Sequence, residues 1–284
     1  MANNIHWYPG HMKKATIKIE ERIKSVDLVI ELLDSRAPLS SINTDFERIV
    51  GNKKRLFVFT KNDLADKAQT EKWKEYFQKD NKDVLLLDIS RDNVSKVLTD
   101  AIKMYGKEKR EKEIAKGMKP QPIRAMIVGI PNVGKSTLIN KLSKRRAAGV
   151  ENRPGFTRGE QFIKVNNDFL LVDTPGILPM SYDDKKKATN LALIGSIREE
   201  ILPKYDLVNY LFNFFKEHYP DALAKRYGIS EINDIQETVN MIGSKRGAIR
   251  NKGEVDIEKV TSLILSEFRN GLIGNFTLEW VNNA

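Results

Sequence analysis

The octapeptide at residues 129–136 constrains the fold more than any other stretch of this 284-residue chain. It has the spacing G-x-x-x-x-G-K-S, with an apolar run before it and helical spacing after it. Between a strand and a helix, such a loop turns backbone N–H groups toward phosphate oxygens, and the helix dipole adds to the attraction. We expect Lys135 to reach the β- and γ-phosphates and the Ser136 hydroxyl to ligate Mg²⁺. The phosphate-binding residues expected here are Asn132, Val133, Gly134, Lys135, Ser136 and Thr137.

Charge is distributed unevenly along the chain, whose net charge is +10. Residues 1–178 carry 34 Lys and Arg against 23 Asp and Glu, whereas residues 179–284 carry 14 against 15. The basic residues cluster near the N-terminus, at 103–119 and after the phosphate loop. Each cluster alone is typical of a solvated helix face, but three clusters in one half of the chain favour a nucleic-acid surface. The candidate nucleic-acid-binding residues are Lys144, Arg145 and Arg146, followed by Lys245, Arg246, Arg250 and Lys252.

Composition excludes several classes of protein. The chain has no cysteine and only three histidines, which excludes disulfides and thiolate metal sites and leaves little for a zinc site. No apolar run is long enough to span a bilayer, and no apolar stretch follows the polar N-terminus. We therefore expect a cytoplasmic protein that has no membrane contact. We also expect the protein to be a monomer.

Six apolar runs alternate with helical patterns as far as residue 172. This alternation predicts an α/β fold with a doubly wound, mostly parallel six-stranded sheet, helices on both faces and one antiparallel edge. The charge-dense segment 106–122 is closed by two prolines, which indicates a linker or a mobile helix end. The expected strands are residues 28–33, 56–59, 84–87, 125–128, 161–165 and 169–172.

From about residue 180 the strand signals stop and helical stripes replace them. Apolar residues recur with helical spacing over 191–201, 207–215 and 257–268, a pattern typical of helices that pack in a bundle. We therefore divide the chain into an α/β domain at residues 1–178 and a C-terminal all-α domain at residues 179–284.

A tetrapeptide after the second expected strand indicates which nucleotide is bound. Thr60, Lys61, Asn62 and Asp63 resemble N-K-x-D, the guanine-reading motif of GTPases. Guanine offers N1–H and N2–H₂, which one carboxylate can accept together, and adenine lacks this pair of donors. Thr60 replaces the usual Asn, which we expect to weaken the bracing of the loop while leaving the discriminating Asp63 in place. Ser90 stands where such proteins carry an S-A-K loop.

A D-x-x-G motif at residues 173–176 follows the last expected strand. We expect Asp173 to hold Mg²⁺ through water, the Gly176 N–H to bond the γ-phosphate, and Thr157 to act as the threonine switch in the metal shell. These motifs occur in a permuted order, because the guanine-type motif and Ser90 precede the phosphate loop. The sequence therefore predicts a circularly permuted P-loop GTPase sheet, whose γ-phosphate-sensing segment runs directly into the helical domain.

The permuted order and further motifs across nearly the whole chain resemble the bacterial ribosome biogenesis GTPase A family. The resemblance implies binding and hydrolysis of GTP coupled to late assembly of the large (50S) ribosomal subunit, and a helical domain that binds ribosomal RNA. One alternative is an RNA-binding module in which the nucleotide merely locks a conformation. Another is a signalling GTPase with a protein effector, although the basic clusters argue against it. The motifs are WYPGHM at 7–12, DSRAP at 34–38, NRPGFT at 152–157, DTPGIL at 173–178 and GLIG at 271–274.

Two residues carry hypotheses about catalysis. In Ras-like enzymes a Gln soon after D-x-x-G orients the attacking water, but Ile177 stands here and no Gln lies between it and Tyr205. The resemblance places His11 near the γ-phosphate, where its imidazole would orient water; alternatively His11 packs against Trp7 or caps the next helix. Asn132 is similar to a position that ligates K⁺ in potassium-activated relatives, and otherwise it caps the phosphate loop.

Overall fold

A computed structural model describes residues 10–143, 162–172, 177, 184–197, 201–250 and 253–281. Within these ranges one six-stranded sheet has the strand order β3-β2-β1-β4-β6-β5. Neighbouring strands are parallel except β5 and β6, which pair antiparallel at the edge. The strands are β1 (Leu28–Asp34), β2 (Lys54–Thr60), β3 (Asp83–Leu86), β4 (Ile123–Gly129), β5 (Phe162–Lys164) and β6 (Phe169–Val172).

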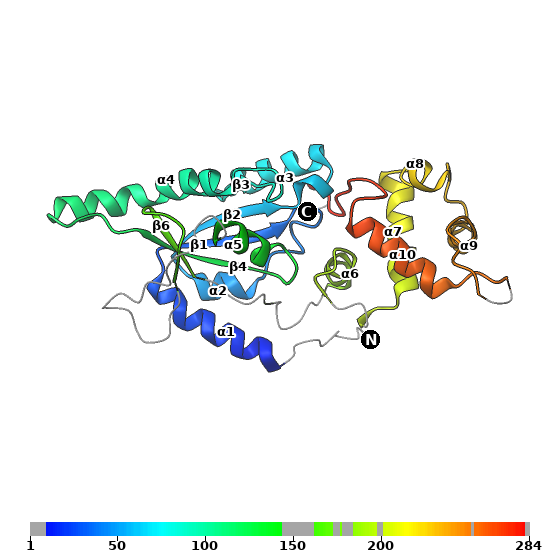
Figure 1. The fold of residues 1–284 in the computed structure, drawn as a ribbon, viewed down its shortest axis with the longest axis horizontal. Coiled ribbons are helices and arrows are strands. Elements are labelled where there is room, and N and C mark those ends of the chain that lie inside the picture. Colours follow the sequence, from blue (N-terminus) through cyan, green and yellow to red (C-terminus); the bar gives the residue numbers. More distant parts are fainter. Residues whose placement is uncertain are drawn as a thin grey trace.

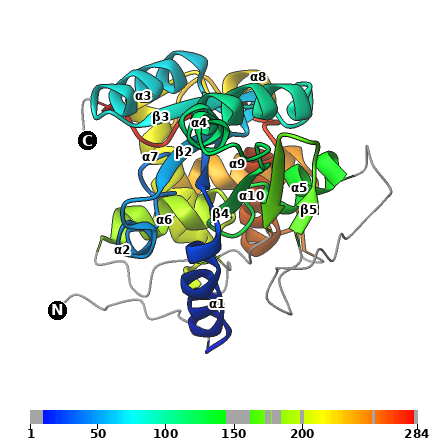
Figure 2. The same ribbon diagram turned by 90° about the vertical axis from the view of Figure 1, so that its left-hand side faces the viewer.

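Helices cover both faces of this sheet (Figures 1 and 2). Successive side chains of a strand point to opposite faces, so the two sides of β1 enter different cores. Ile30 packs in the core that includes α4 and α5, whereas Val29 packs with α1 and α2 and Leu33 packs with α3. The helices in this part are α1 (Gly10–Arg22), α2 (Asp45–Val50), α3 (Lys67–Lys79), α4 (Val94–Ala115) and α5 (Lys135–Ser143).

The α/β expectation is confirmed, including all six strands and the antiparallel edge. The segment predicted as a linker or helix end is mostly helix, because α4 continues to Ala115 and only residues 116–122 connect it to β4. Figure 1 shows the end of α4 projecting beyond the strands. None of the helices in the described ranges combines the length and the apolar character needed to cross a membrane.

The remaining helices pack beside one end of the sheet (Figure 1). α7 and α10 contribute Phe215 and Phe268 to a shared apolar core, with the two rings 6.4 Å apart. The expected single stripe over 191–201 is wrong in part, because Gly195 adopts a φ of 79° and ends the helix in a Schellman-type turn. The helices are α6 (Lys185–Leu193), α7 (Lys204–His218), α8 (Ala224–Tyr227), α9 (Ile235–Lys245) and α10 (Ile257–Arg269).

The chain after α10 returns to the α/β part. The Leu278 N–H donates to the Arg36 carbonyl oxygen at 2.7 Å. The buried Glu279 carboxylate accepts bonds from the N–H groups of Leu39 at 2.7 Å and Ser40 at 3.1 Å, and from the Asn190 side-chain amide at 3.1 Å. The tail therefore follows the helical segment in sequence but lies against the loop after β1 in space.

Replacing Glu279 by Ala should lower the free energy of unfolding by about 3 kcal/mol, because it leaves several buried donors without an acceptor. Urea titration measures this loss. Glu71→Ala is the control, since Glu71 is exposed on α3 and forms an exposed ion pair with Lys74 at 3.3 Å, so its loss should stay within about 0.5 kcal/mol. Equal effects of the two substitutions would contradict the structural role of the tail.

Candidate nucleotide-binding site

The phosphate loop joins the end of β4 to the start of α5. Gly129 has a φ of 152°, and a Cβ there would lie 2.8 Å from the Leu32 carbonyl oxygen, so a side chain is excluded at this position. Lys135 is buried, and its Nζ donates to the carbonyl oxygens of Gly129 at 3.0 Å and Ile130 at 2.8 Å. The Lys135 side chain thus folds back over its own loop. The exposed residues of this loop and the first turn of α5 include Asn132, Ser136 and Thr137.

The guanine-type loop lies beside the phosphate loop, and Thr60 joins the two. The Thr60 side chain is fully buried, and its hydroxyl lies 2.7 Å from the Val133 carbonyl oxygen and 3.1 Å from that of Leu33. We expected that Thr in place of Asn weakens the bracing of this loop. The shorter hydroxyl still reaches the phosphate loop, and the weakening relative to Asn stays a prediction.

Asp63 follows in a 3-10 turn over Asn62–Leu64 and is exposed, while Lys61 before it has a left-handed φ of 57°. Ser90 lies in the turn after β3, where its N–H donates to the Asp88 carboxylate at 2.8 Å. Lys141 of α5 donates from Nζ to the Ser90 carbonyl oxygen at 3.1 Å, which ties this turn to the helix of the phosphate loop. Residues from three separate segments therefore meet at the carboxyl ends of β2, β3 and β4.

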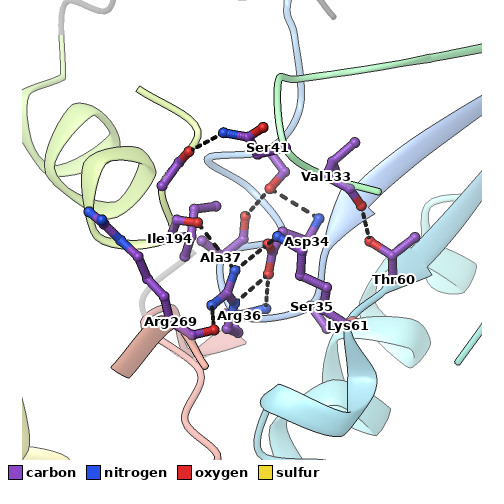
Figure 3. Close-up of polar contacts among 12 residues, drawn as sticks. Asp34, Ser35, Arg36, Ala37, Ser41, Thr60, Lys61, Val133, Ile194 and Arg269 are labelled. Carbon is purple, nitrogen blue, oxygen red and sulfur yellow. Dashed lines mark hydrogen bonds and ion pairs between the residues drawn. The ribbon is translucent and has the colours of Figure 1, made fainter. Parts of the chain in front are cut away.

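A buried ion-pair cluster, which we call the Asp34 cluster, contains Asp34, Arg36 and Lys61 (Figure 3). Asp34 is fully buried at the end of β1. Its Oδ1 accepts from Arg36 Nε at 2.9 Å, and its Oδ2 accepts from a terminal nitrogen of Arg36 at 2.7 Å and from Lys61 Nζ at 2.9 Å. Burial alone raises the pKa of the Asp34 carboxyl, but the charges of Arg36 and Lys61 overcome this and hold it well below its usual range.

Arg36 also connects the Asp34 cluster to the helical part. Its terminal nitrogens donate to the carbonyl oxygens of Arg269 at 3.2 Å and Ile194 at 3.3 Å. At the same end of α6, Arg269 donates to the Ala192 carbonyl oxygen at 2.7 Å, and Asn132 of the phosphate loop donates from Nδ2 to the Gly195 carbonyl oxygen at 2.7 Å. The carbonyl groups at the end of α6 therefore accept bonds from Arg36, from the phosphate loop and from α10 together.

Neither Asp34 nor Arg36 was predicted as a site residue from the sequence. Both lie in the DSRAP segment, and an Asp at the end of an apolar strand followed by an Arg two residues later is the local signal for this pair. No local pattern identifies Lys61, Ile194 or Arg269 as partners, because they lie on other elements.

Several expected site residues lie outside the described ranges, or only their backbone is described. Among the basic candidates, Lys245 ends α9 and donates from Nζ to the Tyr227 carbonyl oxygen at 2.6 Å, while Arg250 pairs with Asp256 at 3.3 Å. Arg246 donates to the Arg226 carbonyl oxygen at 3.2 Å. His11 lies in the first turn of α1, with its side chain outside the description. The residues wholly outside are Lys144, Arg145, Arg146, Thr157, Asp173, Gly176 and Lys252.

The described part of the chain contains no group of three or more His, Cys, Asp and Glu side chains placed to hold a metal ion. Of the three residues expected around Mg²⁺, Ser136 alone is described, and its exposed hydroxyl is a hard oxygen donor of the kind that Mg²⁺ accepts.

Comparison with known proteins agrees with this architecture. A family model described as "50S ribosome-binding GTPase" matches residues 124–246. The chain is 43% identical to ribosome biogenesis GTPase A of Bacillus cereus, over 97% of this chain and 93% of the relative. It is 32% identical to the Thermotoga maritima protein of that name, over 96% of this chain and 93% of the relative.

Solved structures give the same result. GNP-bound YlqF from T. maritima superposes with a TM-score of 0.70 at 29% identity, covering 95% of this chain and all of that one. A GDP-bound YlqF structure gives a TM-score of 0.70 at 28% identity, covering 93% of this chain and 99% of that one. The order of the motifs along the chain is consistent with the circular permutation expected from the sequence. The chain therefore belongs to the ribosome biogenesis GTPase A family and is a GTP-hydrolysing enzyme.

Proposed function

We propose that this GTPase binds a precursor of the large ribosomal subunit, contacts its ribosomal RNA, and uses GTP hydrolysis to drive a late assembly step. The observation that carries this proposal is the hydrogen bond from Asn132 to Gly195, because it joins the phosphate loop directly to the end of α6. A change at the phosphates therefore has a short physical route to the helical part. The names of the relatives and of the matching family model support the ribosomal partner.

In this proposal the nucleotide lies across the carboxyl ends of β2 and β4. Asp63 accepts the two guanine donors, the stem of Lys61 packs on the base, and Lys135 contacts the phosphates. Mg²⁺, held by Ser136 and Thr157 and through water by Asp173, supplies charge neutralisation at the phosphates when bound. The amide oxygen of Asn132 is the atom that a potassium ion would use.

The catalytic group in this proposal is His11, which would accept a proton from the attacking water. It lies in the first turn of α1 and is the histidine of the WYPGHM motif. Ile177 is buried and apolar, so it offers no atom that would orient water.

Asp63→Asn should exchange guanine for xanthine selectivity, because xanthine presents an acceptor where guanine presents a donor. We expect GTP affinity to fall by orders of magnitude, toward the roughly 10⁴-fold scale of such donor–acceptor discrimination, while XTP affinity rises. Equilibrium titration with both nucleotides measures the exchange. Asp80→Asn, an exposed acid at the end of α3, should change neither affinity. Tight GTP binding by the Asp63 variant would rule out this carboxylate as the base reader.

His11→Ala should leave nucleotide and particle binding intact and should lower particle-stimulated GTP turnover at least tenfold, of the roughly 10⁵-fold stimulation that assisted GTPases reach. Turnover is measured with purified large-subunit precursors and with none. Glu21→Ala, an exposed acidic residue of α1 that is not part of a basic cluster, is the matched control and should retain the stimulation. Full stimulation of the His11 variant would remove it from catalysis, and no stimulation of the unmodified protein would contradict the ribosomal role.

Replacing Lys144, Arg145 and Arg146 by Glu should reduce the dependence of ribosomal-RNA affinity on salt. Each lost phosphate contact removes roughly 0.7 from the log–log slope with single strands, so three contacts remove about 2. The comparison variant reverses Lys67, Lys72 and Lys79, three exposed lysines of α3, and changes the net charge by the same amount. Identical slopes for the two variants would place the RNA interface elsewhere.

A further inference from the structure

The Asp34 cluster does more than balance a buried charge. We propose that Asp34 is a positioning residue for the guanine nucleotide: it fixes the Lys61 side chain in the base-reading loop before nucleotide binds, and Arg36 fixes Asp34. This inference rests on the proposed assignment of Lys61 to the nucleotide site. It adds a determinant that lies outside the N-K-x-D motif, on the neighbouring strand.

Asp34 holds the Lys61 side chain through an ion pair. β1 and β2 are parallel neighbours, and their register places Asp34 opposite Thr60, one residue before Lys61. The Lys61 side chain is 24% exposed, and its Nζ lies 2.9 Å from Asp34 Oδ2. A lysine has a long side chain that loses much rotamer freedom when a ligand orders it. Because Asp34 has already ordered it, nucleotide binding meets a smaller entropic cost.

Arg36 in turn holds the Asp34 carboxylate. It binds both carboxylate oxygens of Asp34 in a forked geometry, which prevents rotation of the carboxylate away from Lys61. A second link joins the same turns, because the Ser35 hydroxyl donates to the Asn62 side-chain oxygen. The turn after β1 therefore contacts two side chains of the base-reading loop, Asn62 and Lys61, at separate points.

A double-mutant cycle tests whether Asp34 acts through Lys61. Affinity for a fluorescent GDP analogue is measured for the unmodified protein, Asp34→Asn, Lys61→Met and the double variant. We expect Asp34→Asn to weaken binding roughly tenfold in the unmodified protein and less than about twofold in the Lys61→Met background, as expected of strongly coupled neighbours. A purely structural role would give the same loss in both backgrounds, which would overturn the inference.

Glu31→Gln is the matched control. Glu31 is a fully buried carboxylate in the middle of the same strand, and it pairs with Arg55 rather than with the nucleotide loops. This variant should lose stability with less than a twofold change in GDP affinity. An equal loss of affinity for Glu31→Gln and Asp34→Asn would also overturn the inference, because any damage to β1 would then suffice.

Two further measurements distinguish a failure of the positioning role from misfolding and from a failure of the Lys61 assignment. If Asp34→Asn does not fold, Asp34→Glu retains the charge that Arg36 needs and displaces the carboxylate, so the same cycle applies. In the nucleotide-free unmodified protein, nuclear magnetic resonance should detect a slowly exchanging Lys61 ammonium signal, and its absence contradicts the ordering proposed here. If Lys61→Met leaves GDP affinity unchanged, the assignment of Lys61 to the site fails, whereas a loss that is additive with Asp34→Asn overturns the positioning role alone.

Discussion

The buried carboxylate of Asp34 is the constraint on which much of the structure depends. A charge that is fully removed from water must be paired, and removing one partner of such a pair costs about 3–5 kcal/mol. Arg36 and Lys61 supply the pairing. Arg36 in turn uses its remaining donors on the Ile194 and Arg269 carbonyl oxygens. One charge at the end of β1 therefore connects the guanine-type loop, which contains Lys61, with α6 and α10.

The end of α6 is the meeting point of these contacts. Carbonyl groups at the last turn of a helix lack partners within the helix and carry partial negative charge, so cationic side chains stabilise them. Here Arg36 and Arg269 occupy that position, and the Asn132 amide joins them from the phosphate loop. A rearrangement of the phosphate loop would thus be transmitted to the end of α6 through the Asn132–Gly195 hydrogen bond, without involving the D-x-x-G segment.

Local patterns in the sequence were sufficient to predict the sheet, the phosphate loop and the permuted order of the motifs. Each of these depends on spacing within one stretch, such as the glycine-rich loop that ends in Lys135. The bond from Thr60 to Val133 was not predicted. The sequence does not show how far apart the two loops lie, and therefore does not show whether the shorter hydroxyl can bridge them. The break of the helix at Gly195 was missed because apolar residues continue beyond it with helical spacing.

Contacts between distant segments account for the rest, and the tail is the clearest case. Glu279 lies 240 residues after Leu39, and its carboxylate accepts a hydrogen bond from the Leu39 N–H. During synthesis from the N-terminus, the N–H groups of Leu39 and Ser40 can only bond to water until the helical segment and then the tail have been made. Long-range closures of this kind are slow steps in folding. The turn that bears Asp34 and Arg36 would thus complete its contacts last, and a nascent chain would possess its phosphate loop before this turn is fully supported.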